Sequence, residues 1–347
     1  MSPSAVLAFL RCTSARFTCY YFLGFYAGLG PVAADRPEWL AFGVVYWFVH
    51  STVTELLNRL ADREPDEVNR PERTALCAEV GWDRLRRIAV AGYGLLLLLG
   101  VGWFVAVPTA AVAGLLLLAA FLCLNYSYGL RLGRSRFGSL VVLAFPFVGS
   151  YTGGWALAEP DAGWGGPDGF LAGAGPELLV GGLALASLSG AKDLTDMVGD
   201  VLKGYRSGWL WLVRGRMPAV GAVVAALPFG VLGLLVAAGA LAPRHLALLL
   251  LLPAALLLTS GSRLAFQADE QMAVREFFYH YWIAFLAVLV LCHLPSRLSV
   301  ATVAVSLLAW RLATAHLHWL PARPPALGGR GWLPTVLLLH RPATSGR

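Results

Sequence analysis

Long apolar segments separated by short polar ones recur along the 347-residue chain. A helix that crosses a bilayer needs about 20 predominantly apolar residues. Short breaks around Pro108 and Pro243 predict two tight antiparallel hairpins. We therefore expect an all-α polytopic membrane protein, with nine or ten transmembrane helices around a central cavity. The predicted spans are 17–34, 39–58, 86–106, 109–127, 138–158, 176–193, 217–240, 244–262, 274–294 and 298–319.

The last of these segments decides the expected number. If 298–319 spans the bilayer, the arginine-bearing tail is cytoplasmic; if it lies on the surface, nine spans remain. We expect one helical membrane domain over residues 1–320, with a catalytic core at about 17–294, followed by a polar basic tail over 321–347.

Composition and charge agree with this class. The chain is 58% hydrophobic and 14% charged, whereas a soluble domain carries about 25% charged residues. The net charge of +7 fits basic cytoplasmic loops, and no aromatic-plus-basic repeat points to nucleic acid. Most of the 27 Lys and Arg fall at the N-terminus and in alternate loops, which are therefore predicted to be cytoplasmic. The loops on the opposite side hold only Arg36, Arg244 and Arg297. The five Cys are scattered and are expected to be reduced core residues.

Two acidic stretches each follow an apolar segment on the predicted cytoplasmic side. The first reads NRLADREPDEVNRPER over 58–73, and the second reads KDLTDMVGDVLKGYR over 192–206. Carboxylates one helical turn apart lie on one helix face, and two such faces would form a cage of oxygens that suits Mg²⁺ bound to phosphate. Flanking Arg and Lys would hold the phosphates. The alternative for either stretch alone is a solvated charged loop, but the presence of both favours a diphosphate site at the membrane surface.

The same residues resemble the motifs of the UbiA family of intramembrane aromatic prenyltransferases, over about residues 17–294. The family's Asn-x-x-x-Asp-x-x-x-Asp is matched by Asn58, Asp62 and Asp66, and its Asn-x-Pro-x-Arg by Asn69, Pro71 and Arg73. The second motif is matched by Asp193, Asp196, Gly199, Asp200, Gly204 and Arg206, and a third element by YSYGLRLGR over 126–134.

The resemblance implies a UbiA-like bundle of nine helices, Mg²⁺ as cofactor, an isoprenyl diphosphate as donor and an aromatic, quinone-type or lipid-like acceptor. The implied catalytic residues are Asp62, Asp66, Asp196, Asp200 and Tyr126. The implied metal ligands are Asn58, Asp62, Asp66, Asp193, Asp196 and Asp200. We predict that the diphosphate is bound by the basic residues of these stretches, which are Arg59, Arg73, Arg131, Arg134, Lys192 and Arg206.

Two of the departures from the family pattern change a charge, and a third puts Tyr128 and Gly129 where the family often has Pro-Pro. Arg59 stands where an acid is common, and Gly133 stands where a Lys is common, which leaves Arg131 and Arg134 as the local cations. Arg59 either binds diphosphate or pairs with a loop acid, Glu64 or Glu67. Lys192 likewise either pairs with the acidic cluster or binds diphosphate.

Several other side chains bear on the interpretation. Glu55 lies inside the second span and must face protein or the cavity. His50 is expected to be a buried, hydrogen-bonded histidine. The remaining candidates His280, His293, His316 and His318 have no acidic or Cys partner at ligand spacing, so no metal site is expected there.

These features are compared with three functions. The first is a prenyltransferase. The second is a membrane terpene cyclase that ionises the same diphosphate without an acceptor, because aromatic residues are plentiful and could stabilise a cation. The third, a transporter with acids at helix ends, explains neither the order of the motifs nor the arginines that follow them.

Overall fold

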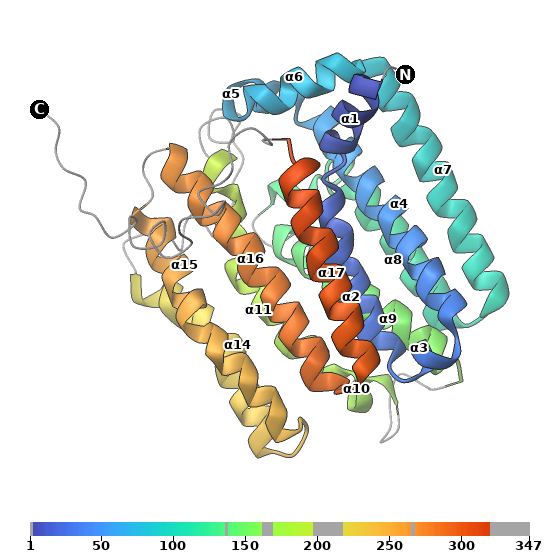
Figure 1. Cartoon of the computed structure of the whole chain (residues 1–347), viewed down its shortest axis with the longest axis vertical. Helices are drawn as coiled ribbons and strands as arrows, with labels where there is room; N and C mark the ends of the chain where they lie inside the picture. Colours follow the sequence, from blue (N-terminus) through green and yellow to red (C-terminus); the bar gives the residue numbers. More distant parts are fainter. Residues whose placement is uncertain (1–2, 136–137, 162–168, 197–217, 265–267, 320–347) are drawn as a thin grey trace, which may run out of the picture.

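The structure is a computed structural model that describes residues 3–135, 138–161, 169–196, 218–264 and 268–319, and these residues form a bundle of helices (Figure 1). The elements in chain order are α1 (Pro3–Cys12), η1 (Ala15–Phe17), α2 (Thr18–Leu29), α3 (Val32–Asp35), α4 (Pro37–Ala61), α5 (Arg63–Asn69), α6 (Pro71–Val80), α7 (Trp82–Ala106), α8 (Ala110–Asn125), η2 (Leu132–Arg134), α9 (Gly138–Ala158), α10 (Phe170–Gly173), α11 (Gly175–Leu188), η3 (Ser189–Asp196), α14 (Pro218–Ala237), η4 (Pro243–Leu251), α15 (Leu252–Leu264), α16 (Ala268–His293) and α17 (Arg297–His316).

Seven helical segments of the described chain are long and apolar enough to cross a membrane: α4, α7, α9, α14, η4 with α15, α16 and α17. α8, with 16 residues, is shorter. The first expected span ends early, because α2 stops at Leu29 and Gly30 follows with a φ of 58°. The sixth expected span changes from an α-helix to a 3₁₀ helix, because α11 ends at Leu188 and η3 begins at Ser189. The total of nine or ten spans stays a prediction.

Both predicted hairpins are present. α7 ends at Ala106 and α8 begins at Ala110, after Thr109 caps the new helix by accepting a hydrogen bond from the Val112 amide at 3.2 Å. α14 ends at Ala237, and the chain re-enters the bundle at Pro243. The members of each hairpin pack against each other.

α2 lies at the centre of the bundle and packs against α4, α9, α16 and α17. Its contact with α9 is a close approach of two backbones. A Cβ atom added at Gly28 would lie 1.9 Å from the Tyr151 carbonyl oxygen, and one added at Gly154 would lie 2.1 Å from the Phe25 oxygen. Small residues spaced by four allow such contacts in membrane helices, so this seam is a fixed wall of the bundle.

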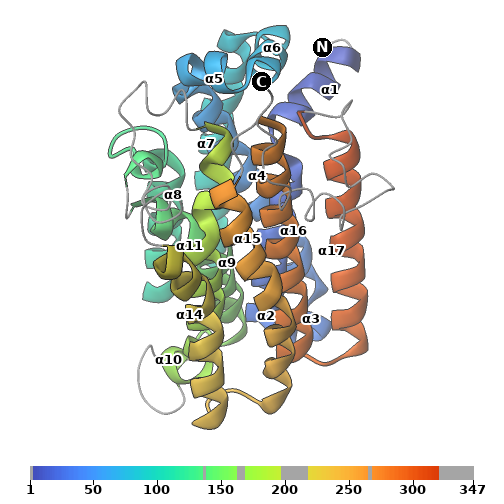
Figure 2. The same cartoon turned by 90° about the vertical axis from the view of Figure 1, so that its left-hand side faces the viewer.

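Large apolar side chains point outward on the peripheral helices, such as Val105, Leu117 and Leu250. An apolar outer surface is what a lipid-facing bundle requires. At one end, by contrast, α1, α5 and α6 lie across the helix ends as a cap (Figure 1). Arg70 separates α5 from α6 with a φ of −148° and a ψ of 63°, because a residue before proline is disfavoured in the helical region. Figure 2 shows α10 and the turn after α14 at the opposite end.

Candidate active site

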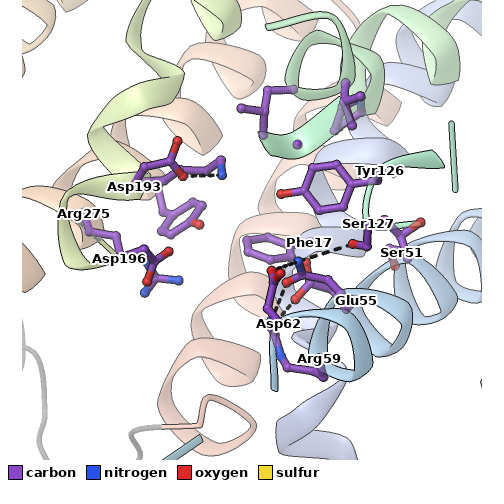
Figure 3. Close-up of a pocket in the computed structure, with 18 of the residues that line it drawn as sticks. Phe17, Ser51, Glu55, Arg59, Asp62, Tyr126, Ser127, Asp193, Asp196 and Arg275 are labelled. Atoms are coloured by element: carbon purple, nitrogen blue, oxygen red, sulfur yellow. Dashed lines mark hydrogen bonds and ion pairs between the residues drawn. The ribbon is translucent and has the colours of Figure 1, made fainter. Parts of the chain in front are cut away.

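A single cavity opens beneath this cap, and it gathers both acidic stretches. In Figure 3, Asp193 and Asp196 lie on one side of it, and Asp62 and Glu55 lie on the other. Ten residues predicted as site residues line it: Asn58, Arg59, Asp62, Asp66, Arg73, Tyr126, Arg134, Lys192, Asp193 and Asp196. Arg131 is not among the lining residues; it is exposed, with a φ of 50°. The predictions for Asp200 and Arg206 fall outside the described residues.

The first acidic stretch is bent where the spacing predicts an uninterrupted helix. α4 ends at Ala61, and Asp62 has a φ of −98° and a ψ of 18°. The turn-to-turn hydrogen bonds nevertheless continue, from the Asp62 amide to the Asn58 carbonyl and from the Asp66 amide to the Asp62 carbonyl, both at 2.9 Å. The three side chains therefore line the same cavity, although a bend at Asp62 separates α4 from α5.

The second acidic stretch reaches the cavity through a different helix geometry. η3 is a 3₁₀ helix, in which residues three apart lie above one another. This places Asp193 and Asp196 on the same side of the segment. Lys192 Nζ lies 2.6 Å from Asp193 Oδ1, so the structure has Lys192 paired with the acidic cluster.

Arginines from other segments pair with the cavity carboxylates. Arg134 lies 2.6 Å from Asp62, Arg73 pairs with Asp66, and Arg70 pairs with Asp196. These are charge-assisted contacts, which are stronger than neutral hydrogen bonds.

Direct hydrogen bonds also join the two acidic stretches. Asn69 Nδ2 donates to the Asp196 carbonyl at 2.8 Å, and Arg70 donates to Thr195 Oγ1 at 2.8 Å. Within the first stretch, Asn58 Nδ2 donates to Asp62 Oδ2 at 2.5 Å. The cap and η3 are thus held together by side chains of the site itself.

Arg59 has a partner that the sequence interpretation did not consider. Its guanidinium pairs with Glu55, one turn earlier on α4, and donates to Asn58 Oδ1 at 2.8 Å and Ser14 Oγ at 3.1 Å. In the alternative that pairs Arg59 with a loop acid, the structure has Glu55 as the partner, whereas Glu67 lies 3.7 Å from Arg63. Binding of diphosphate by Arg59 stays a prediction. Glu55 lines the cavity, as its position inside a span predicts.

Burial and neighbouring charges shift the pKa values of Arg70 and Asp196, which both lie outside the membrane-spanning segments. Burial lowers the pKa of Arg70 to about 10, despite the opposing influence of Asp196. For Asp196, burial raises the pKa, but the positive charges of Arg70, Arg73 and Arg275 outweigh it and hold the pKa below its ordinary value. Asp196 is therefore charged at neutral pH in the middle of a cationic cluster.

Gly133, the second departure from the family pattern, packs against Tyr126. A Cβ atom at position 133 would lie 2.7 Å from the Tyr126 ring. The absence of a side chain therefore gives the Tyr126 ring its place at the cavity wall, and a Lys at 133 would displace it.

Sequence reasoning missed Arg70 and Arg275 as cavity residues. Arg275 is 4% exposed and lies 3.0 Å from Glu276, which also accepts two hydrogen bonds from Arg16 at 2.7 and 3.0 Å. A signal existed, because charged residues beside an apolar helix are costly unless used. The aromatic lining of the cavity comprises Phe17, Tyr20, Tyr21, Tyr126, Tyr279 and Trp282.

Trp319, just after α17, adds a further aromatic contact. Its ring centre lies 5.7 Å from the Arg70 guanidinium, 6.0 Å from that of Arg73 and 5.9 Å from that of Arg275. Such distances permit cation–π attraction. The last helix thus supports the arginines of the site, although it lies beyond the predicted catalytic core.

His50 is buried beside Ala119, with Nε2 3.3 Å from its carbonyl oxygen, as predicted. His293 has an acidic partner that its spacing in the sequence does not reveal, because its Nδ1 lies 3.1 Å from Glu177 Oε1.

A family model described as the UbiA prenyltransferase family matches residues 17–284. This chain belongs to the UbiA prenyltransferase family. It is therefore a membrane prenyltransferase in general class, and the motifs on which the resemblance rested mark a true relationship. A solved structure, described as digeranylgeranylglyceryl phosphate synthase in membranes, is similar in fold with a TM-score of 0.57 and 13% identity. The alignment covers 84% of this chain and 99% of the other. No curated protein matches this UbiA member by sequence.

Proposed function

We propose that this UbiA-family member ionises an isoprenyl diphosphate in a Mg²⁺-dependent reaction and transfers the prenyl group to an aromatic, quinone-type or lipid-like acceptor. One observation carries the proposal. Asp62 and Asp196 belong to acidic stretches far apart in the sequence, yet both line one cavity and each is paired with an arginine there. A site with interleaved carboxylates and arginines suits a divalent cation and a polyanion bound together.

The donor set of the described site fits Mg²⁺. Mg²⁺ prefers oxygen ligands, and it is commonly held by one or two carboxylates together with substrate phosphates. Bound Mg²⁺ would act as a Lewis acid that stabilises the negative charge of the departing diphosphate. The residues proposed to hold it are Asn58, Asp62, Asp66, Asp193 and Asp196, and Asp200 remains a predicted ligand.

The cavity cations supply the complementary half of the site. The guanidinium fork of arginine matches phosphate oxygens in a bidentate manner. Arg73, Arg134, Arg70 and Arg275 line the cavity, and in this proposal they bind the diphosphate and stabilise its charge as the carbon–oxygen bond breaks. Lys192 contributes a further positive charge on the η3 side.

The aromatic wall favours the fate that we propose for the prenyl cation. Tyr20 stacks on Trp282 with ring centres 4.4 Å apart, and Tyr21 stacks on Trp47 at 5.2 Å. A cation over an aromatic face gains about 0.5–2 kcal/mol, and a water-poor pocket protects it from hydrolysis. The acceptor would then form a bond to the prenyl cation. The hydroxyl of Tyr126, at the cavity wall, would be a hydrogen-bond partner for the acceptor.

The same wall favours a second candidate, a membrane terpene cyclase. Aromatic faces that stabilise an allylic cation also stabilise the cations formed when a prenyl chain closes on its own double bonds. The two candidates share the ionisation step and differ only in what traps the cation.

The deciding experiment incubates membranes that contain the protein with Mg²⁺ and C15, C20 or C25 isoprenyl diphosphate, with and without a phenolic or quinone-type acceptor. Consumption of diphosphate only when acceptor is present supports the transferase. Terpene hydrocarbons or alcohols formed without acceptor support the cyclase. Asp62→Asn should abolish either activity, whereas Glu67→Gln, at an exposed acid of the same cap, should retain it. Diphosphate that stays intact in every combination contradicts both.

A further inference from the structure

A second polar cluster lies at the end of the bundle opposite the acidic stretches. Glu177 stands in the first turn of α11, His245 in the first turn of η4 and His293 at the last residue of α16. Both views of the bundle place these helix ends away from α5 and α6 (Figures 1 and 2). Glu177 is 6% exposed and His245 is 2% exposed, so the cluster is built into the protein.

The three side chains converge on one point. His293 Nδ1 lies 3.1 Å from Glu177 Oε1, and His245 Nε2 lies 3.7 Å from the same oxygen. One potential ligand atom from each residue lies within 4.8 Å of the other two. Zinc binds imidazole nitrogen and carboxylate oxygen at about 2.0–2.2 Å, which places tetrahedral ligand atoms roughly 3.4 Å apart. The His293–Glu177 and His245–Glu177 distances therefore lie on either side of the value that one zinc ion requires.

Hydrogen bonds set the direction of both imidazoles. His245 Nδ1 lies 3.0 Å from the Ala242 carbonyl oxygen, which can only accept, so in the neutral imidazole Nδ1 carries the proton and Nε2 presents its lone pair. His293 Nε2 lies 3.3 Å from the Tyr151 hydroxyl, which leaves Nδ1 facing Glu177. A metal-ligating histidine almost always donates its other N–H to a carbonyl, carboxylate or water, and His245 has this arrangement.

The lone pair of His245 has no hydrogen-bond partner among the described residues, and neither does Glu177 Oε2. Two electron-rich groups, both buried, thus face each other across 3.7 Å. Buried polar atoms are nearly always satisfied, and a carboxylate opposite an imidazole lone pair calls for a cation between them.

The backbone around the cluster is held independently of any ion. Arg244 donates to the Cys292 carbonyl oxygen and, at 3.2 Å, to that of His293, while Cys292 Sγ donates to the Arg244 carbonyl oxygen at 3.2 Å. This clamp joins the residues beside His245 to the end of α16. The two imidazoles are therefore positioned in advance, as a specific site requires.

We propose that Glu177, His245 and His293 form a binding site for a zinc ion, separate from the acidic cavity. Imidazole ligands suit Zn²⁺, whereas Mg²⁺ prefers carboxylate, carbonyl and water oxygens. Three protein ligands leave a fourth position for water. The ion would join α11, η4 and α16 at the ends of the helices farthest from the diphosphate site.

The test counts zinc bound to the full-length protein. Purified protein, stripped with a chelator, is equilibrated with Zn²⁺ in excess Mg²⁺ that occupies the acidic cavity, then desalted and analysed by elemental mass spectrometry. We expect one zinc per chain for the unchanged protein and for Asp62→Asn, and none for His245→Gln. His316→Gln, at an exposed histidine on α17, is the matched control and should retain zinc.

Two further readouts make the result decisive if a variant fails to fold. Co²⁺ added to the unchanged protein should give the visible absorption bands of a tetrahedral nitrogen–oxygen site, and Zn²⁺ should raise its Tm because it binds only the folded state. The proposal is overturned if the unchanged protein retains no zinc and shows no cobalt bands. It is equally overturned if a folded His245→Gln protein retains as much zinc as the control.

Discussion

Arg59 offers the sharpest test of how the site is built, because the sequence and the structure assign it different tasks. Its side chain is 5% exposed and that of Glu55 is 16% exposed, and the two form an ion pair along α4. We predict that Arg59→Gln removes the only cation paired with Glu55 in the described structure. The carboxylate then stays in a largely buried place without compensation.

The expected loss of stability follows from this burial. Breaking a buried ion pair by removing one partner costs about 3–5 kcal/mol. Glu55 faces the cavity and keeps some contact with water, so the lower value of about 3 kcal/mol applies. An unfolding entropy of about 2.1 cal/mol/K per residue over 347 residues then gives a fall in Tm of about 4 °C. The double variant Glu55→Gln/Arg59→Gln removes both charges and should recover most of this loss.

The assay combines thermal unfolding of the purified protein, followed by tryptophan fluorescence, with the KM for the isoprenyl diphosphate. A structural role predicts a lower Tm for Arg59→Gln, rescue in the double variant and little change in donor KM. The reasoning fails if Arg59→Gln unfolds at the unchanged temperature while its donor KM rises. That result would show Arg59 binding diphosphate, as the sequence suggested.

The remaining predictions test the cavity and its orientation. Asp196→Ala should lower turnover at least about 100-fold, because a proposed Mg²⁺ ligand is lost, and near-normal turnover with C20 diphosphate would contradict its role. Arg134→Ala should raise the donor KM about 10-fold, since a hydrogen bond to a charged group contributes roughly 1.5–3 kcal/mol; an unchanged KM would remove Arg134 from the diphosphate site. Gly133→Ala should displace the Tyr126 ring and lower turnover without lowering Tm by more than a few degrees, and activity equal to that of the unchanged protein would show that the ring position is unimportant. Single cysteines introduced at Ser135 and Asp161 in a cysteine-free background should label from the cytoplasm and from the opposite side, respectively; the reverse pattern would invert the predicted topology.

The sequence predicts the helical class and much of the cavity because those features depend on local pattern. Apolar length marks α9 at the same residues, 138–158, that the structure shows. The spacing of Asp62 and Asp66 survives the bend between α4 and α5, since the hydrogen bonds of the helix continue through it. Motif order then identifies the second half of the site, which periodicity alone does not connect to the first.

Local sequence pattern does not predict contacts between residues that are far apart in the chain. Arg275 lies in the first half of α16 with no motif around it. Tyr279 is one turn further along the same helix, whereas Trp319 reaches Arg275 only through the packing of the segment that follows α17. His293 and Glu177 are 116 positions apart, so no ligand spacing could reveal them. The sequence-based alternative pairs Arg59 with acids later in the chain, although a pair four residues apart can also form with Glu55, one turn before it.

The pairing of cavity carboxylates with arginines has a thermodynamic consequence for the proposed substrate. Mg²⁺ alone would compete with Arg134 for Asp62 and leave that guanidinium without its anion, and diphosphate alone would compete with Asp62 for Arg134 and leave the carboxylate bare. When both ligands bind, Mg²⁺ replaces Arg134 as the partner of Asp62, and diphosphate replaces Asp62 as the partner of Arg134. Each ligand should therefore strengthen the binding of the other by the same factor, as linkage requires. The protein would then bind the magnesium–diphosphate complex much more tightly than it binds free metal or uncomplexed phosphate.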